Sequence, residues 1–184
     1  MILAYFLWFL LPLWVLAGIA DYVCHRRTAL ERTSGLGESE LHVLQAIQIA
    51  VPLLAGLFLE IDALVLTVMI LSVIAHTLTA LRDETYTAAR RYISPLERHV
   101  HSHLEYIPIV AVSLVVMLYW RALAAPSFAL HPKEHPIPVS YLVAVLVPVF
   151  LVQGVLLTEE TWRAWRAAQR VREDWPATRV HDRA

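Results

Sequence analysis

The chain has 184 residues, of which 58% are hydrophobic and 17% are charged, and its formal net charge is −1. A soluble domain of this length is closer to half apolar and a quarter charged, so the composition argues against a soluble domain and indicates an integral membrane protein of one domain. The net charge gives no sign of a nucleic-acid partner, and we expect none. The single cysteine, Cys24, excludes an internal disulfide.

Five apolar segments follow one another along the chain, and each has the roughly 20 residues that a helix needs to cross a bilayer. They are Ile2–Tyr22, Leu41–Leu59, Ile61–Leu81, Leu104–Leu123 and Ile137–Leu157. Lipid offers backbone amides no hydrogen-bond partner, so the segments must be helical. The sequence therefore predicts an all-α, polytopic bundle of five transmembrane helices, in which a very short turn at Glu60–Asp62 pairs the second and third helices as a hairpin.

Arginines mark one side of this bundle. The loops and tail on that side carry Arg26, Arg27, Arg32, Arg82, Arg90, Arg91, Arg98, Arg163, Arg166 and Arg170. The other side has only Arg121 and Lys133. The positive-inside rule then places the amino terminus outside and the carboxyl terminus in the cytoplasm. Lys133 is the only lysine, which favours a GC-rich, bacterial coding sequence and hence a bacterial cytoplasmic membrane.

We expect the transmembrane bundle to occupy residues 1–158 and a cytoplasmic tail to occupy residues 159–184. The tail mixes tryptophans with arginines, which is typical of an amphipathic helix lying on an anionic leaflet. A solvated tail with aromatic anchors is an equally good interpretation. Upstream, Ser94-Pro95-Leu96-Glu97 predicts a helix start, with serine as N-cap, proline at the first position and glutamate closing a capping box. The fourth helix would then begin in the cytoplasm.

Six of the nine histidines fall at the predicted cytoplasmic ends of these helices, with carboxylates beside them. Asp21 and His25, and likewise Glu38 and His42, are four residues apart, which places each pair on one helical face. The expected metal ligands are Asp21, His25, Glu38, His42, His76, Asp83, His99 and His103. Facing helices that present ligands at such spacing form metal sites inside helical bundles.

Imidazole with carboxylate suits iron, zinc or manganese, and the ligands suffice for two ions. His76 lies about 10 Å deeper than Asp83, at a depth where an idle polar ring is costly. His99 and His103 share one stripe of their helix; the opposite orientation would present His101 with Glu97 and Glu105 instead. Tyr86 is a candidate proton or hydrogen-bond partner in catalysis, or equally an interfacial anchor.

This layout, together with the run His99-Val100-His101-Ser102-His103, resembles the membrane-bound histidine-rich di-iron enzymes of the fatty acid desaturase and hydroxylase type. The adjacent His-His pairs of that family's motifs are absent from this chain. The resemblance implies two iron ions, a lipid or other hydrophobic substrate, and a soluble electron donor at the cytoplasmic face. It assigns no individual residue.

Two other classes of function remain open. A zinc-dependent membrane hydrolase needs three protein ligands and an open position for water, which His42, His99 and His103 with Asp21 as base would supply. A non-catalytic haem protein, metal carrier or structural subunit is the other class, although haem ligands usually lie deeper in the bilayer. The chain has no P-loop, dinucleotide fingerprint or nucleophile elbow, which disfavours nucleotide chemistry and serine hydrolysis.

Overall fold

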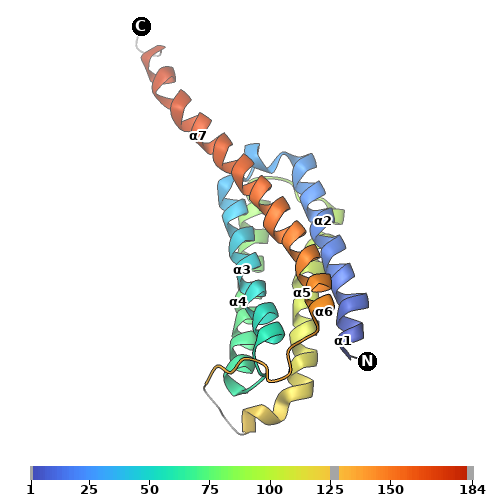
Figure 1. Ribbon diagram of the computed structural model, residues 1–184. Helices are drawn as coiled ribbons and strands as arrows, with labels where there is room; N and C mark the ends of the chain where they lie inside the picture. Colours follow the sequence, from blue (N-terminus) through green and yellow to red (C-terminus); the bar gives the residue numbers. More distant parts are fainter. Residues whose placement is uncertain (1, 125–128, 182–184) are drawn as a thin grey trace.

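Helices make up most of the computed structural model, which describes residues 2–124 and 129–181 (Figure 1). In chain order they are α1 (Ile2–Tyr5), the π-helix η1 (Phe6–Leu10), α2 (Leu11–Thr28), the short 3-10 helix η2 (Leu30–Arg32), α3 (Leu36–Phe58), α4 (Ala63–Ala88), α5 (Pro95–Tyr119), the 3-10 helix η3 (Trp120–Ala124), α6 (Val139–Val149), the π-helix η4 (Phe150–Leu156) and α7 (Leu157–His181). The all-α prediction is confirmed.

Five of the described helical stretches are long and apolar enough to cross a membrane: Phe6–Thr28, Leu36–Phe58, Ala63–Ala88, Pro95–Ala124 and Val139–Arg172. Each contains most of one segment predicted from the sequence, so the number of candidate spans is confirmed. α4 is the most buried of these five stretches, and its Val65, Leu66 and Met69 are almost completely buried. Burial of such side chains stabilises the bundle against the neighbouring helices.

Local sequence signals set the helix boundaries. α3 and α4 form the predicted hairpin, and the Asp62 carboxylate caps α4 by accepting a hydrogen bond from the Val65 amide at 2.9 Å. Ser94 caps α5 in the same way, accepting from the Glu97 amide at 3.1 Å, with Pro95 in the first turn. The capping box also predicts that the Glu97 carboxylate accepts from the Ser94 amide. In the structure this carboxylate accepts a hydrogen bond from Arg91 instead.

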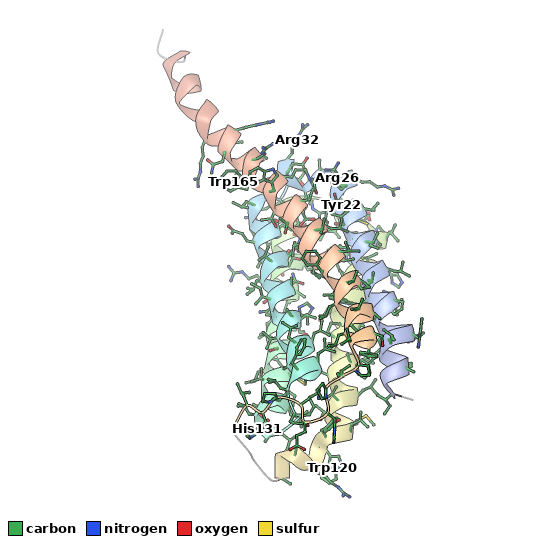
Figure 2. The ribbon with its side chains drawn as sticks, viewed as in Figure 1. Tyr22, Arg26, Arg32, Trp120, His131 and Trp165 are labelled. Atoms are coloured by element: carbon green, nitrogen blue, oxygen red, sulfur yellow. The ribbon has the colours of Figure 1, made fainter. Side chains whose placement is uncertain are left out.

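One end of the bundle collects most of the polar and charged groups. There α2 and α4 finish, α3 and α5 begin, and α7 passes alongside them; we call it the polar end (Figure 1). Figure 2 shows Tyr22, Arg26, Arg32 and Trp165 at this end, and Trp120 and His131 at the opposite one. The chain thus brings four helix termini and the middle of a fifth, longer helix to one level.

The fifth span does not stop where the sequence analysis placed the tail. α6, η4 and α7 follow one another without a break, and Figure 1 shows α7 crossing the bundle and extending beyond the polar end. The start of the expected tail, from residue 159, is therefore packed against the bundle. Tyr22 of α2 donates a hydrogen bond to Glu159 at 2.9 Å, and Ser39 of α3 to Thr161 at 2.9 Å.

Candidate metal centre

Two stacked imidazoles lie at the heart of the polar end. His25 of α2 and His42 of α3 have ring centroids 4.6 Å apart and planes inclined by only 5°. One carboxylate from α7 serves both rings: Glu160 lies 2.8 Å from Nδ1 of His25 through one oxygen and 2.8 Å from Nδ1 of His42 through the other. Glu160 and His25 are almost fully buried.

This pairing fixes the tautomers of the two rings. A carboxylate at hydrogen-bond distance from Nδ1 accepts a proton from that atom, which leaves Nε2 of the neutral ring with a lone pair. Histidines that bind metals are usually held in this way, with the second nitrogen donating to a carboxylate. The geometry therefore turns Nε2 of both rings inward, away from Glu160.

A first group of possible ligand atoms surrounds Nε2 of His25. Oδ1 of Asp21 lies 3.4 Å from it, and Nε2 of His101 lies 2.9 Å from that same oxygen. All three atoms are buried, and none makes a hydrogen bond of normal geometry to a described residue, although His101 and Asp21 are close enough to form an ion pair. Metal–ligand bonds of about 2.1 Å in a tetrahedral site put neighbouring ligand atoms about 3.4 Å apart, so the group has the dimensions of a metal site.

A second group surrounds Nε2 of His42. Oδ2 of Asp83 lies 3.2 Å from that nitrogen, and Oε1 of Glu38 lies 3.9 Å from it. The same Glu38 oxygen is 3.7 Å from Nε2 of His25, so this carboxylate stands between the two groups. Glu97, also fully buried, comes within 3.7 Å of Nε2 of His25. The two groups of possible ligand atoms therefore adjoin each other at Glu38.

Arg91, from the loop between α4 and α5, closes the centre on one side. Its Nη2 donates to Glu38 at 2.5 Å and to Glu97 at 2.6 Å. Burial by itself lowers the pKa of a guanidinium, but these two hydrogen bonds raise the pKa of Arg91 above its ordinary value. The side chain is only 4% exposed and stays charged.

Acidic groups outnumber the permanently charged basic group in the centre, and the remaining balance depends on the protonation of the imidazoles. Five carboxylates converge here, from Asp21, Glu38, Asp83, Glu97 and Glu160, against the single guanidinium of Arg91. With neutral imidazoles this leaves four negative charges in a largely buried space, and uncompensated buried charge is costly. Two divalent cations would neutralise the centre.

Further contacts support the inner groups from outside. His101 repeats the pattern of the other two rings, because its Nδ1 lies 3.4 Å from the carboxylate of Glu84 while Nε2 faces Asp21. Gln45 donates to Asp83 at 3.2 Å. Each of the three imidazoles therefore has an outer carboxylate on Nδ1 and an inner carboxylate near Nε2.

The structure brings together five of the eight residues predicted as ligands: Asp21, His25, Glu38, His42 and Asp83. α3 begins at Leu36, so Glu38 and His42 share a helical face as the sequence analysis required.

The remaining three predicted ligands lie outside these groups. His99 is exposed, and Nδ1 of His103 lies 2.9 Å from the backbone carbonyl of His99. The stripe of α5 expected to face the bundle thus faces away, and His101 faces inward. His76 is buried one helical turn or more deeper, outside the groups of possible ligand atoms found among the described residues.

Tyr86, the predicted catalytic residue, lies beside the start of α3. Its hydroxyl donates to the carbonyl of Ser34 at 3.3 Å, and the Arg90 guanidinium lies over its ring at 3.5 Å. These contacts hold the end of α4 against the turn before Glu38. A catalytic role for Tyr86 stays a prediction.

Sequence reasoning missed Glu160 and Arg91 and placed Glu97 and His101 only in an alternative set. A signal for Glu160 was present, since Glu159 and Glu160 end the fifth apolar segment on the same side as the other acids. Their assignment to a tail concealed it. Arg91 was counted only as a topology marker, although Glu38 and Glu97 are the acids that a buried arginine needs as partners.

Two cavities adjoin the centre, and a third lies farther into the bundle. One of about 80 Å³ lies between α2, α3, α4 and η4 and is lined by Asp21, His42 and Glu160. A second, of about 290 Å³, lies toward α4 and α5 and is lined by Asp83 and His101. The third, of about 220 Å³ and almost wholly apolar, lies farther from the polar end and shares Trp14 and Ile49 with the first.

The arrangement offers groups of imidazole and carboxylate atoms of the kind that bind metal ions, with an apolar cavity nearby in the bundle. Carboxylates beside the ions can also accept and return protons. Comparisons of the chain with protein-family models, with curated proteins and with solved structures find no match.

Proposed function

We propose that this chain is an integral membrane enzyme with a dinuclear metal centre at its polar end, and that it oxidises a hydrophobic substrate. The observation that carries the proposal is the double layer of carboxylates around three imidazoles. Outer carboxylates hold Nδ1 of His25, His42 and His101, and inner carboxylates face Nε2 of the same rings. A structural ion pair needs only one of these layers, whereas a metal site needs both.

The donor set favours iron over zinc. The inner groups offer three imidazoles and the carboxylates of Asp21, Glu38, Asp83 and Glu97, with Glu38 between the two groups. Oxygen-rich sets of this kind, with carboxylates and histidines on facing helices, are typical of dinuclear iron and manganese sites. A hydrolytic zinc site is complete with three protein ligands and an open water position, so this chain presents more ligands than that chemistry requires.

The apolar cavity supports a substrate drawn from the membrane. It is lined by side chains such as Leu53, Val112 and Val145, and two of its lining residues, Trp14 and Ile49, also line the cavity beside His42. In the class of reaction proposed, O2 is reduced by four electrons. Two come from a C–H bond of the substrate, and two come from a soluble donor. One oxygen atom enters the substrate as a hydroxyl, and the other leaves as water with two protons.

The arginine asymmetry supports a cytoplasmic polar end, with the amino terminus outside and the carboxyl terminus in the cytoplasm of a bacterium. A soluble electron donor would then approach the centre from the cytoplasm. The exposed Arg26 and Arg98 flank this end and offer a basic surface to an acidic donor.

Elemental analysis of detergent-purified protein tests the proposal. We expect two iron ions per chain, and we expect His25→Ala to lose them while His135→Ala, at the opposite end of the bundle, keeps them. A content of one zinc ion per chain would favour a zinc-dependent hydrolase over the proposed oxidoreductase. Absence of bound metal after reconstitution with iron, manganese and zinc would overturn the proposal altogether.

A further inference from the structure

His76 is a buried imidazole with no side-chain partner in the part of the chain that the structure describes. Its side chain is 5% exposed, and neither ring nitrogen makes a hydrogen bond to a described residue; the backbone of Gln45 and of Leu104 lies beside the ring without normal hydrogen-bond geometry. A buried polar group left unsatisfied costs about 1–3 kcal/mol. Such a ring therefore points to a ligand that the protein takes up.

The ring has a place for that ligand beside it. His76 lines the 80 Å³ cavity together with Gln45 and Gln153, and the metal-centre residues His42 and Asp21 form the adjoining wall. A space of this size admits a small group only, such as the end of an alcohol. Amide and imidazole groups make this part of the lining uncharged, although Asp21 and Glu160 lie just beyond it.

The apolar cavity of about 220 Å³ is the neighbour of this small cavity toward the opposite end of the bundle, and Trp14 and Ile49 line both cavities. Its lining of leucine, isoleucine and valine side chains around Pro52 and Met69 suits a hydrocarbon chain. We call these two neighbouring cavities the pocket: it has one apolar part, one small polar part and the candidate metal centre beside the polar part.

We infer that this pocket takes an uncharged single-chain amphiphile, with its hydrocarbon chain in the apolar cavity and a terminal hydroxyl or carbonyl oxygen at His76. A neutral imidazole offers one donor and one acceptor, which matches a hydroxyl and not an anionic head. The Gln45 and Gln153 amides beside His76 are uncharged, so this part of the lining offers no positive charge to a fatty-acid carboxylate or a phosphate. The inference rests on the proposed function, because in this binding mode the substrate carbon that carries the oxygen lies beside the proposed metal ions.

Binding of three tritiated probes to the purified, iron-loaded protein tests the inference: 1-decanol, decane and decanoate. We expect 1-decanol to bind at least tenfold more tightly than either of the others. His76→Leu should abolish the preference over decane, and His76→Gln, which keeps a donor and an acceptor, should retain most of it. Equal binding of decane and 1-decanol to the unaltered protein, or tightest binding of decanoate, would overturn the inference.

A matched pair on α5 tests where the chain lies. Val112 lines the apolar cavity, and Val110, two residues away, is 42% exposed on the outer face of the same helix. Val112→Phe should weaken 1-decanol binding at least tenfold, and Val110→Phe should leave it unchanged. Equal effects of the two substitutions would remove the cavity as the site of the chain.

Metal content measured on the same samples separates this inference from the proposed function. Iron-loaded protein without a preference for 1-decanol contradicts the inference alone. If the protein binds no metal but prefers 1-decanol, the proposed oxidoreductase function is contradicted and the assignment of the amphiphile pocket is supported. Loss of iron in His76→Leu would make His76 a metal ligand, as the sequence predicted, and would overturn its assignment to the substrate.

Discussion

Glu160 contacts two imidazoles at once, and each contact uses a different carboxylate oxygen. A carboxylate can do this because both oxygens accept hydrogen bonds. An amide in the same position has one oxygen and one NH2 group, so one imidazole would face a donor instead of an acceptor. The orientation of His25 and His42 thus depends on a charge that lies outside the inner ligand groups.

We therefore expect Glu160→Gln to weaken metal binding by 10- to 100-fold, the usual effect of losing an outer carboxylate partner. Competition with a chromophoric chelator measures the change. Glu159→Gln is the matched control, because Glu159 is 41% exposed and its partners are Tyr22, Arg26 and Arg163. Equal affinity in the two variants would mean that Glu160 does not support the ligands.

The three histidines at the start of α5 allow a second test at this scale. His101→Ala should lower the metal content, because Nε2 of His101 faces Asp21 at 2.9 Å. His103→Ala should leave it unchanged, because that ring faces away and contacts the backbone of His99. The reverse result, measured by elemental analysis, would restore the orientation of α5 that the sequence suggested.

At the scale of the helices, the start of α3 depends on a close contact with α4. A Cβ atom added to Gly37 would lie 2.1 Å from the Tyr86 hydroxyl oxygen and 2.6 Å from the adjoining ring carbon. No real contact is so short, so either the tyrosine or the helix must move. Glu38 is the next residue, which makes this contact a determinant of where a candidate ligand lies.

Gly37→Ala should therefore lower the free energy of unfolding by about 1–3 kcal/mol, the range typical of overpacking. Thermal denaturation in detergent measures the loss. Tyr86→Leu shortens the opposing side chain and should relieve part of the loss in the double variant. Strict additivity of the two substitutions would show that they do not touch.

Parts of the site could be predicted because they are local to one helix. The four-residue spacing places Asp21 beside His25 and Glu38 beside His42, and no tertiary information is needed for either pair. The rotation of α5 about its axis could not be predicted in this way, because His99, His101 and His103 make both of its faces polar. Glu160 follows the π-helix η4, and a π-turn shifts the phase of every later residue in a manner that hydrophobic periodicity does not reveal.

At the scale of the whole molecule, the number and length of the spans follow from hydrophobicity, because lipid requires long apolar helices. Hydrophobicity does not predict which of these helices pack against one another. Lipid tails and leucine side chains are equally apolar, so an apolar helical face does not indicate whether it meets lipid or protein. The close approach of α7 to α2 and α3 arises from Glu159, Glu160 and Thr161, the residues that composition assigned to a tail.

The orientation of the bundle is open to a direct test. Reporter fusions after Arg27, Glu60, Arg91, Pro132 and Arg172 should alternate, with the first, third and fifth in the cytoplasm. The arginines at the polar end provide the physical reason. A fusion after Arg91 that reports the outer side would place the proposed metal centre at the opposite face and separate it from a cytoplasmic electron donor.

The order in which the helices leave the ribosome gives the position of Glu160 a further meaning. The other four carboxylates, the three imidazoles and Arg91 all precede residue 102, whereas Glu160 arrives only with the last helix. Until then Nδ1 of His25 and of His42 lacks its acceptor, and neither ring is held in its binding orientation. We therefore expect the proposed metal centre to form only once α7 is in place, so that a chain truncated before Glu160 binds metal less tightly.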